Sequence, residues 1–355
     1  MGLARERERL IAAGLDPSVV DTMQRSRAPS TRKVYQGKLE AFEEWCRVKH
    51  PSVNPVFSSI PIILEFLQDR VDRNCKASTV RGYLAAIRAC HQSLDGDQLS
   101  KHPWVVQFMA AVRRDSLTAR PLAPAWDLEV VLRGLGQPPF EPLESISLKL
   151  LSYKTALLLA LTTAKRVSDL HALSVSEDCM RFSPDGRQVL LKPHLHFIPK
   201  NKVVQHVPVR LLAFHPPPFG TEEDRRLNLL CPVRALKIYC ERTQARRKSR
   251  SLFVPHGKST ATMEIAKATL SGWIVDAIRL AYDSANVARP VGFTAHSTRG
   301  MSSSWGLWQG TTIQEVCLAA NWTSPSTFAA HYQLDVAPRS LAHSVLQVAA
   351  DSSAE

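Results

Sequence analysis

A histidine and an arginine three residues apart form the first group of side chains that could carry out chemistry. His296 and Arg299 lie in the segment Thr294-Ala295-His296-Ser297-Thr298-Arg299-Gly300. If Thr294 caps a helix, both side chains lie on one face of its first turn. Helix N-termini favour anions, so an imidazole and a guanidinium placed there would address a phosphate. The pair alone is a weak signal, because a surface position explains most such pairs.

A second arginine follows a long apolar stretch, which predicts a buried helix, and opens a new helix. Arg166 is followed by Val-Ser-Asp-Leu, with the carboxylate of Asp169 one helical turn downstream. An arginine beside an apolar helix needs a partner, either an acid or a phosphate. Asp169 could orient the guanidinium toward a ligand. The alternative is a local Arg–Asp pair at the start of a helix, with no ligand.

Two aromatic residues follow near the C-terminal end. Trp322 is followed ten residues later by Tyr332, and of the six tyrosines only Tyr332 lies downstream of His296 and Arg299. A tryptophan at such a place is more often part of a core, and a single tyrosine on a helix usually packs.

The order Arg, Lys, His-x-x-Arg, Trp, Tyr resembles the tyrosine recombinase family, which includes phage integrases. Arg166 matches the first arginine motif of that family, and His296 with Arg299 matches its second motif. Trp322 matches a position that holds His or Trp in the family. Tyr332 matches the nucleophile.

A lysine in a β-turn belongs to the same pattern. In the family it precedes a strand proline by about eight residues, and Lys200 stands eight residues before Pro208. Lys202, two residues further on, is the alternative. The resemblance implies that this lysine is the general acid.

The resemblance extends over most of the chain. Residues 78–88 are similar to a helix of the family's N-terminal core-binding domain, and residues 102–105 to the start of its last helix. The interval from Trp322 to Tyr332 is one residue longer than in many bacterial members. Residues 322–328 resemble eukaryotic mobile-element recombinases of the DIRS and Crypton types.

Hydrophobic periodicity predicts a multidomain fold. It consists of an all-α N-terminal domain and a mainly α C-terminal domain with a small antiparallel β-sheet. The resemblance implies that the first is the core-binding domain and the second the catalytic domain. Four helices are expected to start near Pro29, Pro61, Ser78 and Pro103, and strands between 187 and 209 with a turn near 200–202. The expected divisions are an N-terminal arm at 1–28, the helical domain at 29–114, a linker at 115–127 and the catalytic domain at 128–355 with a C-terminal helical tail.

Composition indicates what kind of partner the protein binds and in which cellular compartment we expect it. The chain of 355 residues has 45 Lys and Arg against 32 Asp and Glu, a net charge of +13, which favours a polyanionic partner. Its 7 cysteines are scattered without a Cys-x-x-Cys pair, which favours a reducing compartment. The longest apolar stretch, 155–164, is too short for a membrane span. We expect a protein that is not secreted, nuclear in a eukaryote and otherwise cytoplasmic.

A tight basic cluster has three open interpretations. Arg246, Arg247, Lys248 and Arg250 lie within five residues. They are consistent with a nuclear-targeting patch, with a loop that contacts phosphate, or with a solvated surface.

The resemblance also implies a mechanism. Arg166 and Arg299 would hold the non-bridging oxygens of a phosphodiester, while Tyr332 attacks it. A phenol has a pKa of about 10 and needs a base, for which His296 is suited. Trp322 could donate its indole N–H to the phosphate. The products are a 3′-phosphotyrosine and a 5′-hydroxyl, so no metal and no other cofactor is expected.

The expected partner is double-stranded DNA, bound by two domains that close around it, with a homotetramer on two DNA sites by analogy. The residues predicted to contact DNA are Arg32, Lys33, Lys76, Arg81, Arg88 and Lys202. One rival interpretation is a type IB topoisomerase, which rejoins the same strand. Another is a domesticated DNA-binding protein without catalysis. An RNA-binding module has little support, because no aromatic stacking motif is visible.

Overall fold

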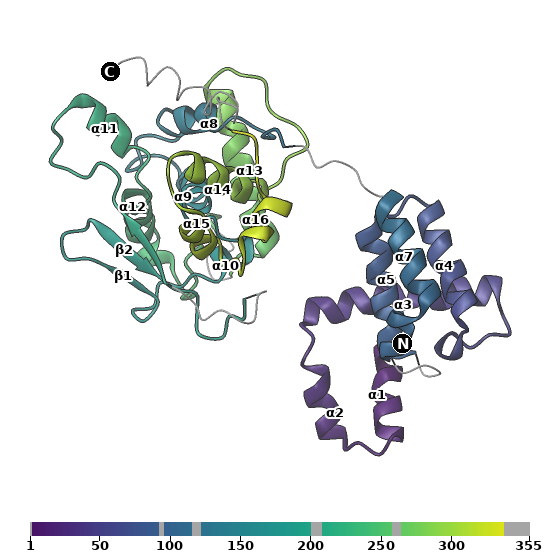
Figure 1. The fold of residues 1–355 in the computed structure, drawn as a ribbon. Helices are drawn as coiled ribbons and strands as arrows, with labels where there is room; N and C mark the ends of the chain where they lie inside the picture. The colour runs from purple at the N-terminus through teal and green to yellow at the C-terminus, as the bar shows by residue number, and fades with distance from the viewer. Residues whose placement is uncertain (1, 92–95, 116–121, 200–207, 258–263, 337–355) are drawn as a thin grey trace, which may run out of the picture. The chain divides into compact units, whose positions relative to one another are not determined.

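The computed structural model describes residues 2–91, 96–115, 122–199, 208–257 and 264–336 (Figure 1). The chain forms two compact units, Met1–Arg120 and Pro121–Glu355. Each unit has its own buried apolar cluster, and each is described by itself.

The regular elements in the described residues of the first unit are all helices. The four predicted helices are confirmed as α3 (Pro29–Lys49), α4 (Ile60–Asp72), α5 (Ala77–Cys90) and α7 (Pro103–Asp115). A short 3-10 turn, η1 (Pro55–Phe57), and helix α6 (Gly96–Lys101) complete this bundle. The stretch expected as an N-terminal arm contains two helices, α1 (Gly2–Ala12) and α2 (Pro17–Gln24). Helix α1 packs against α3 and α5.

Helical spacing of large apolar residues builds the core of this unit. On α3, Phe42, Trp45 and Cys46 recur at intervals of three or four and are buried. The ring of Phe42 lies 4.9 Å from that of Phe66 on α4. These contacts explain why the bundle forms where the periodicity predicts it.

The second unit is mainly helical with one small sheet. Its strands β1 (Met180–Phe182), β2 (Gln188–Leu191) and β3 (Val209–Leu212) are antiparallel in the order β1-β2-β3. The predicted small antiparallel sheet is confirmed, with β1 lying before the predicted stretch. Residues 200–207, where the turn was expected, and the tail at 337–355 lie outside the described residues. The helices are α8 (Leu128–Leu135), α9 (Leu148–Thr163), α10 (Val167–His171), α11 (Glu222–Asn228), α12 (Pro232–Thr243), η2 (Gln244–Arg246), α13 (Lys267–Ser284), α14 (Ser297–Trp308), α15 (Ile313–Ala320) and α16 (Pro325–His331).

Helix α9 is the centre of the second unit. It is buried over most of its length and packs against α12, α13 and α14. Helices α8 and α13 also approach each other closely at Gly134 of α8, where a Cβ atom would lie 2.5 Å from the carbonyl oxygen of Ala281 on α13. The C-terminal end of α9 leads through Ala164 and Lys165 to Arg166.

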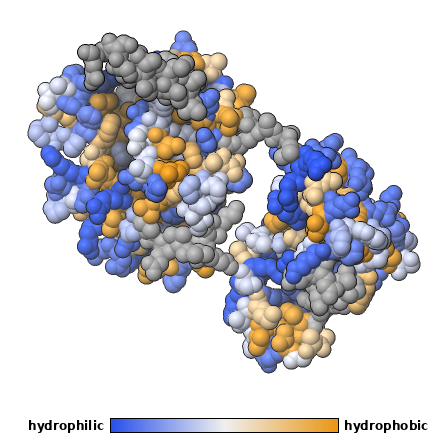
Figure 2. Space-filling model, in the orientation of Figure 1, coloured by the Kyte–Doolittle hydropathy of each residue, from blue (hydrophilic) through white to orange (hydrophobic). Residues whose placement is uncertain are grey.

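The surface of the second unit has an apolar patch over α14 and α15 (Figure 2). Leu307, Trp308 and Leu318 are exposed there. In the part of the chain that the structure describes, no helix has the length and apolar character needed to cross a membrane.

A buried ion pair beside α9 leads to a stability prediction. The ammonium group of Lys154 is fully buried, donates to the carbonyl oxygen of Leu135 at 2.7 Å and pairs with Glu141, which also binds Arg234 at 2.9 Å. Burial lowers the pKa of Lys154 to about 8, although Glu141 opposes this shift. Breaking such a pair from one side costs about 3–5 kcal/mol.

We therefore expect Glu141→Gln to lower the free energy of unfolding by about 3–5 kcal/mol, measured by urea denaturation. The matched control is Glu144→Gln, because Glu144 also pairs with Arg234 but its side chain is 62% exposed. That change should cost less than about 1 kcal/mol. Equal losses in both variants would contradict the assignment of Glu141 as the buried partner.

Candidate active site

Arg166 lies in the turn between α9 and α10, as the sequence predicts. Ala164 ends α9 in a left-handed conformation, with a φ of 50°, and Arg166 is the N-cap residue of α10. The carboxylate of Asp169 accepts a hydrogen bond from the backbone N–H of Arg166 at 3.2 Å. Asp169 thus fixes the turn through the backbone, and Arg166 is half-buried at the start of the helix.

Arg299 and His296 stand at the beginning of α14. The helix begins at Ser297 and its N-cap residue is His296, so the prediction that Thr294 is the cap was wrong. The reason is a preceding turn, in which the Thr294 carbonyl accepts hydrogen bonds from both the N–H and the hydroxyl of Ser297. His296 is exposed, whereas Arg299 is only 1% exposed.

The guanidinium of Arg299 joins the C-terminal ends of two helices. Its Nη1 donates to the carbonyl oxygen of Ala164 after α9 at 2.5 Å, and its Nη2 donates to that of Ala320 on α15 at 3.0 Å. C-terminal carbonyls carry partial negative charge and favour a cation. Burial and the nearby charge of Arg166 lower the pKa of Arg299 to about 10. The guanidinium therefore stays protonated at neutral pH.

Tyr332 lies against this arginine. Its ring centre is 5.1 Å from the guanidinium carbon of Arg299, 4.6 Å from the ring of Trp322 and 5.3 Å from the ring of His296. Tyr332 is half-buried and ends α16, with its N–H donating to the Phe328 carbonyl at 2.8 Å. The structure thus brings together the predicted nucleophile, the predicted base and one of the predicted arginines.

Helix α14 holds the backbone around Tyr332. The hydroxyl of Ser304 donates to the Tyr332 carbonyl at 3.5 Å and accepts from the N–H of Leu334 at 2.8 Å. Gly300 permits this approach, because a Cβ atom there would lie 2.9 Å from the Tyr332 carbonyl oxygen. The residue beside Arg299 therefore decides how closely Tyr332 approaches.

Two buried donors at the site have no hydrogen-bond partner among the described residues. They are Arg299 Nε and the indole Nε1 of Trp322. The guanidinium carbon of Arg299 lies 5.0 Å from the Trp322 ring, so the two donors belong to one cluster. Buried donors are almost always paired, and an anion with several acceptor oxygens would satisfy both. A phosphodiester fits that requirement.

The other tyrosines of the second unit have structural partners instead. Tyr282 accepts at its hydroxyl from the Asp127 N–H at 2.6 Å, and Tyr239 accepts from the Val254 N–H at 3.0 Å. Burial raises the pKa of Tyr239 to about 12. Tyr153 donates to the carboxylate of Asp276 at 3.3 Å. In the described part of this unit, Tyr332 is the one tyrosine beside a predicted site arginine.

Lys165 and Asn321 are site residues that the motif did not reveal. Lys165 is 7% exposed, and its ammonium group donates to the Asn321 Oδ1 at 2.8 Å. Each residue stands next to a predicted one, Arg166 or Trp322. Their burial depends on tertiary packing, so only this adjacency could have drawn attention to them. The predicted lysines Lys200 and Lys202 lie outside the described residues.

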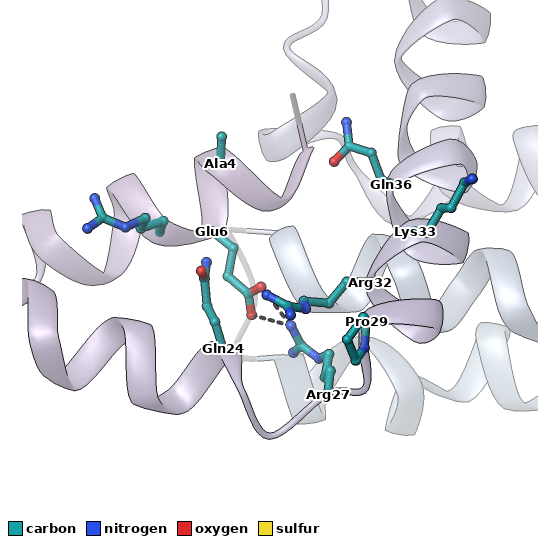
Figure 3. Close-up of a pocket in the computed structure, with 9 residues that line it drawn as sticks. Ala4, Glu6, Gln24, Arg27, Pro29, Arg32, Lys33 and Gln36 are labelled. Carbon is teal, nitrogen blue, oxygen red and sulfur yellow. Dashed lines mark hydrogen bonds and ion pairs between the residues drawn. The ribbon is translucent and has the colours of Figure 1, made fainter. Parts of the chain in front are cut away.

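Predicted DNA contacts in the first unit are spread over two helices. Lys76, Arg81 and Arg88 are exposed at the N-cap and along α5. Arg32 and Lys33, on the first turn of α3, line a cavity of about 390 Å³. In Figure 3, Arg32 lies beside the ion pair of Arg27 with Glu6, whose atoms are 2.6 Å apart.

In the second unit, two members of the basic cluster are held by backbone contacts. Arg246 donates to the Gly257 carbonyl at 2.9 Å, and Arg247 to the Ser251 carbonyl at 2.7 Å. These contacts stabilise the loop that follows α12.

Comparison with protein-family models gave no match, and neither did comparison with curated proteins. Solved structures, however, are similar over nearly the whole chain. The Tn1549 transposon integrase in complex with transposon right end DNA has a TM-score of 0.57 at 13% identity, covering 99% of this chain and 100% of that one. The XerH site-specific recombinase bound to a palindromic difH substrate has a TM-score of 0.53 at 12% identity, covering 92% and 80%.

A lambda integrase dimer bound to a COC′ core site has a TM-score of 0.52 at 15% identity, covering 96% of this chain and 78% of that one. These similar structures are tyrosine recombinases and integrases, and at such identities they establish the fold. The expected fold class is confirmed. The chain has the tyrosine recombinase fold, with a helical N-terminal unit and a mainly α unit that carries a small antiparallel sheet.

Proposed function

We propose that this protein is a site-specific DNA recombinase of a mobile element, which cuts and rejoins DNA strands through a 3′-phosphotyrosine intermediate. The observation that carries the proposal is the position of the Tyr332 phenol against the buried guanidinium of Arg299, 5.1 Å from ring centre to guanidinium carbon. The structural neighbours support it, because they include a transposon integrase and a site-specific recombinase, each with bound DNA.

The two arginines act on the phosphate. The nearby charge of Arg166 lowers the pKa of Arg299, so the two cations repel each other across the site. An anion between them relieves that repulsion, and the pentavalent transition state carries more negative charge than the ground state. The arginines therefore favour the transition state over the bound substrate. The indole N–H of Trp322 adds a donor.

Tyr332 and His296 carry the attack. The phenol oxygen attacks the phosphorus in line and forms a phosphate ester, while its proton passes to the imidazole of His296. The rings of the two residues are 5.3 Å apart. The 5′-oxygen of the DNA leaves as a hydroxyl after protonation by a lysine. Attack by the 5′-hydroxyl of another strand reverses these steps and rejoins the DNA.

The general acid is Lys200, with Lys202 as the alternative. We expect Lys200→Ala to slow cleavage by about 10²–10⁴-fold, the usual contribution of a general acid. A substrate with a 5′-bridging sulfur should restore the rate, because a thiolate leaves without protonation. Lys202→Ala is the matched control: at saturating DNA it should cleave both substrates at the rate of the unmodified protein, because loss of the DNA contact expected of Lys202 lowers affinity and leaves the proton donor in place. Rescue of Lys202→Ala instead would move the assignment by two residues.

Further properties belong to the same proposal. The partner is double-stranded DNA, contacted in part by Arg32, Lys33, Lys76, Arg81 and Arg88. The active assembly is a tetramer on two DNA sites, and the mobile element is of the DIRS or Crypton type, which implies a nuclear location. The dimer on DNA formed by lambda integrase is consistent with an assembly of several protomers.

A strand-transfer assay tests the proposal against a type IB topoisomerase. The protein is incubated with a labelled duplex and with supercoiled plasmid in parallel reactions. Joining of the labelled strand to a different duplex supports recombination. Relaxation of the plasmid without any transfer supports the topoisomerase, and binding without either reaction supports a domesticated DNA-binding protein.

A further inference from the structure

A buried lysine beside Arg166 has no part in the chemistry above. Lys165 follows α9, and Asn321 follows α15, 156 residues later. The hydrogen bond between Lys165 Nζ and Asn321 Oδ1, at 2.8 Å, joins the two turns. One turn leads to Arg166, and the other leads to Trp322, α16 and Tyr332.

The two turns have the same backbone form and share a second link. Ala164 and Asn321 are both left-handed, with φ angles of 50° and 54°. Arg299 binds the carbonyl groups of Ala164 and Ala320, each directly preceding the residue whose side chain makes the first link. Lys165 therefore joins the two turns through a contact between two side chains, whereas Arg299 joins them by donating to one backbone carbonyl of each. Arg299 is also assigned to the phosphate. The hydrogen bond between Lys165 and Asn321 is therefore the link whose only role is to position the two turns.

A contribution to stability does not by itself explain why a lysine occupies this buried position. Burial, opposed by Asp169 and reinforced by the charges of Arg299 and Arg166, lowers the pKa of Lys165 to about 8. A buried cation near two others is costly, and an apolar side chain of similar size would avoid that cost. What the ammonium group adds over an apolar side chain is a charged donor directed at Asn321.

We propose that Lys165 is a positioning residue for Tyr332: through Asn321 it holds the turn before Trp322 and α16 against the turn that carries Arg166. The inference rests on the proposed function, because position matters here for the attack of Tyr332 on a phosphate held by Arg166 and Arg299. Lys165 acts through Asn321 and does not touch the reacting atoms.

The test uses the full chain and a nicked duplex that traps the covalent adduct. Lys165→Met removes the donor at similar length, and Asn321→Gly removes the acceptor while keeping a left-handed residue. Each should slow adduct formation at saturating DNA by about 10-fold or more, the usual effect of losing a hydrogen bond to a charged group. DNA affinity should stay within about twofold, since no DNA contact is removed. The double variant should be no slower than the slower single variant, because both remove one interaction.

The matched control is Asn286→Gly, because Asn286 is also left-handed, with a φ of 53°, and follows α13 away from these turns. It should cleave at the rate of the unmodified protein. Unchanged cleavage in Asn321→Gly, or single effects that multiply in the double variant, would overturn the inference. If Lys165→Met does not fold, the comparison of Asn321→Gly with Asn286→Gly decides. An unmodified chain that binds DNA without forming an adduct overturns the proposed function, and the inference with it.

Discussion

Tyr332→Phe is expected to abolish covalent attachment to DNA while leaving binding nearly intact. The substitution removes only the phenol oxygen, which is the nucleophile, and keeps the ring that packs 4.6 Å from Trp322. Within residues 328–334, at the C-terminal end of α16, Tyr332 carries the only side-chain hydroxyl. Loss of one hydrogen bond changes the dissociation constant by at most about tenfold. Adduct formation on a denaturing gel and DNA affinity by fluorescence anisotropy measure the two effects separately.

Tyr282→Phe is the matched control for this experiment. Its hydroxyl accepts a hydrogen bond from the Asp127 N–H, so its loss should lower stability by about 1 kcal/mol without affecting cleavage. If Tyr332→Phe loses DNA affinity together with cleavage, Tyr332 has a structural role in the DNA interface. If it still forms an adduct, another residue is the nucleophile.

The second large effect is expected for Arg166→Ala. A preorganised donor to the developing charge contributes about 10²–10³-fold to the rate, and a guanidinium can make two such contacts. Cleavage should therefore fall by at least about 100-fold. Arg166 is a better probe than Arg299, because Arg299 also holds the ends of α9 and α15 and its removal would disturb the fold. The measurement is the single-turnover rate of adduct formation at saturating DNA.

Arg279→Ala serves as the control for a general loss of positive charge. Arg279 is an exposed residue of α13 that pairs with Asp276 on the same helix. Its removal should leave the single-turnover rate unchanged. A normal rate in Arg166→Ala would contradict the assignment of this arginine to the phosphate.

Patterns over short stretches of sequence predicted the elements whose formation depends on residues that are close together in the chain. The helices of the N-terminal unit follow from apolar spacing and from Pro29, Pro61 and Pro103 near their starts. Arg166 was correctly placed at the opening of a helix, because the preceding apolar stretch ends there. The resemblance also implied that Tyr332 and His296 share a site, and their rings lie 5.3 Å apart.

What the sequence could not predict depends on contacts between distant segments. The site is closed by links from Arg299 to Ala164 and Ala320 and from Lys165 to Asn321, and each joins residues 21 to 156 positions apart. The spacing of apolar residues along the sequence carries no information about such links between distant segments. The start of α14 was also misplaced, because the Thr294 carbonyl closes a turn with Ser297 before the helix begins. Propensity alone does not distinguish that turn from an N-cap.

Covalent trapping tests the central claim most directly. The purified full chain is incubated with a pool of nicked random-sequence duplexes, the adducts that resist detergent are isolated, and both the DNA and the linked peptide are sequenced. The account predicts an adduct through a 3′-phosphate on Tyr332, enriched for one DNA sequence. DNA binding with no adduct, or an adduct on another residue, would contradict it.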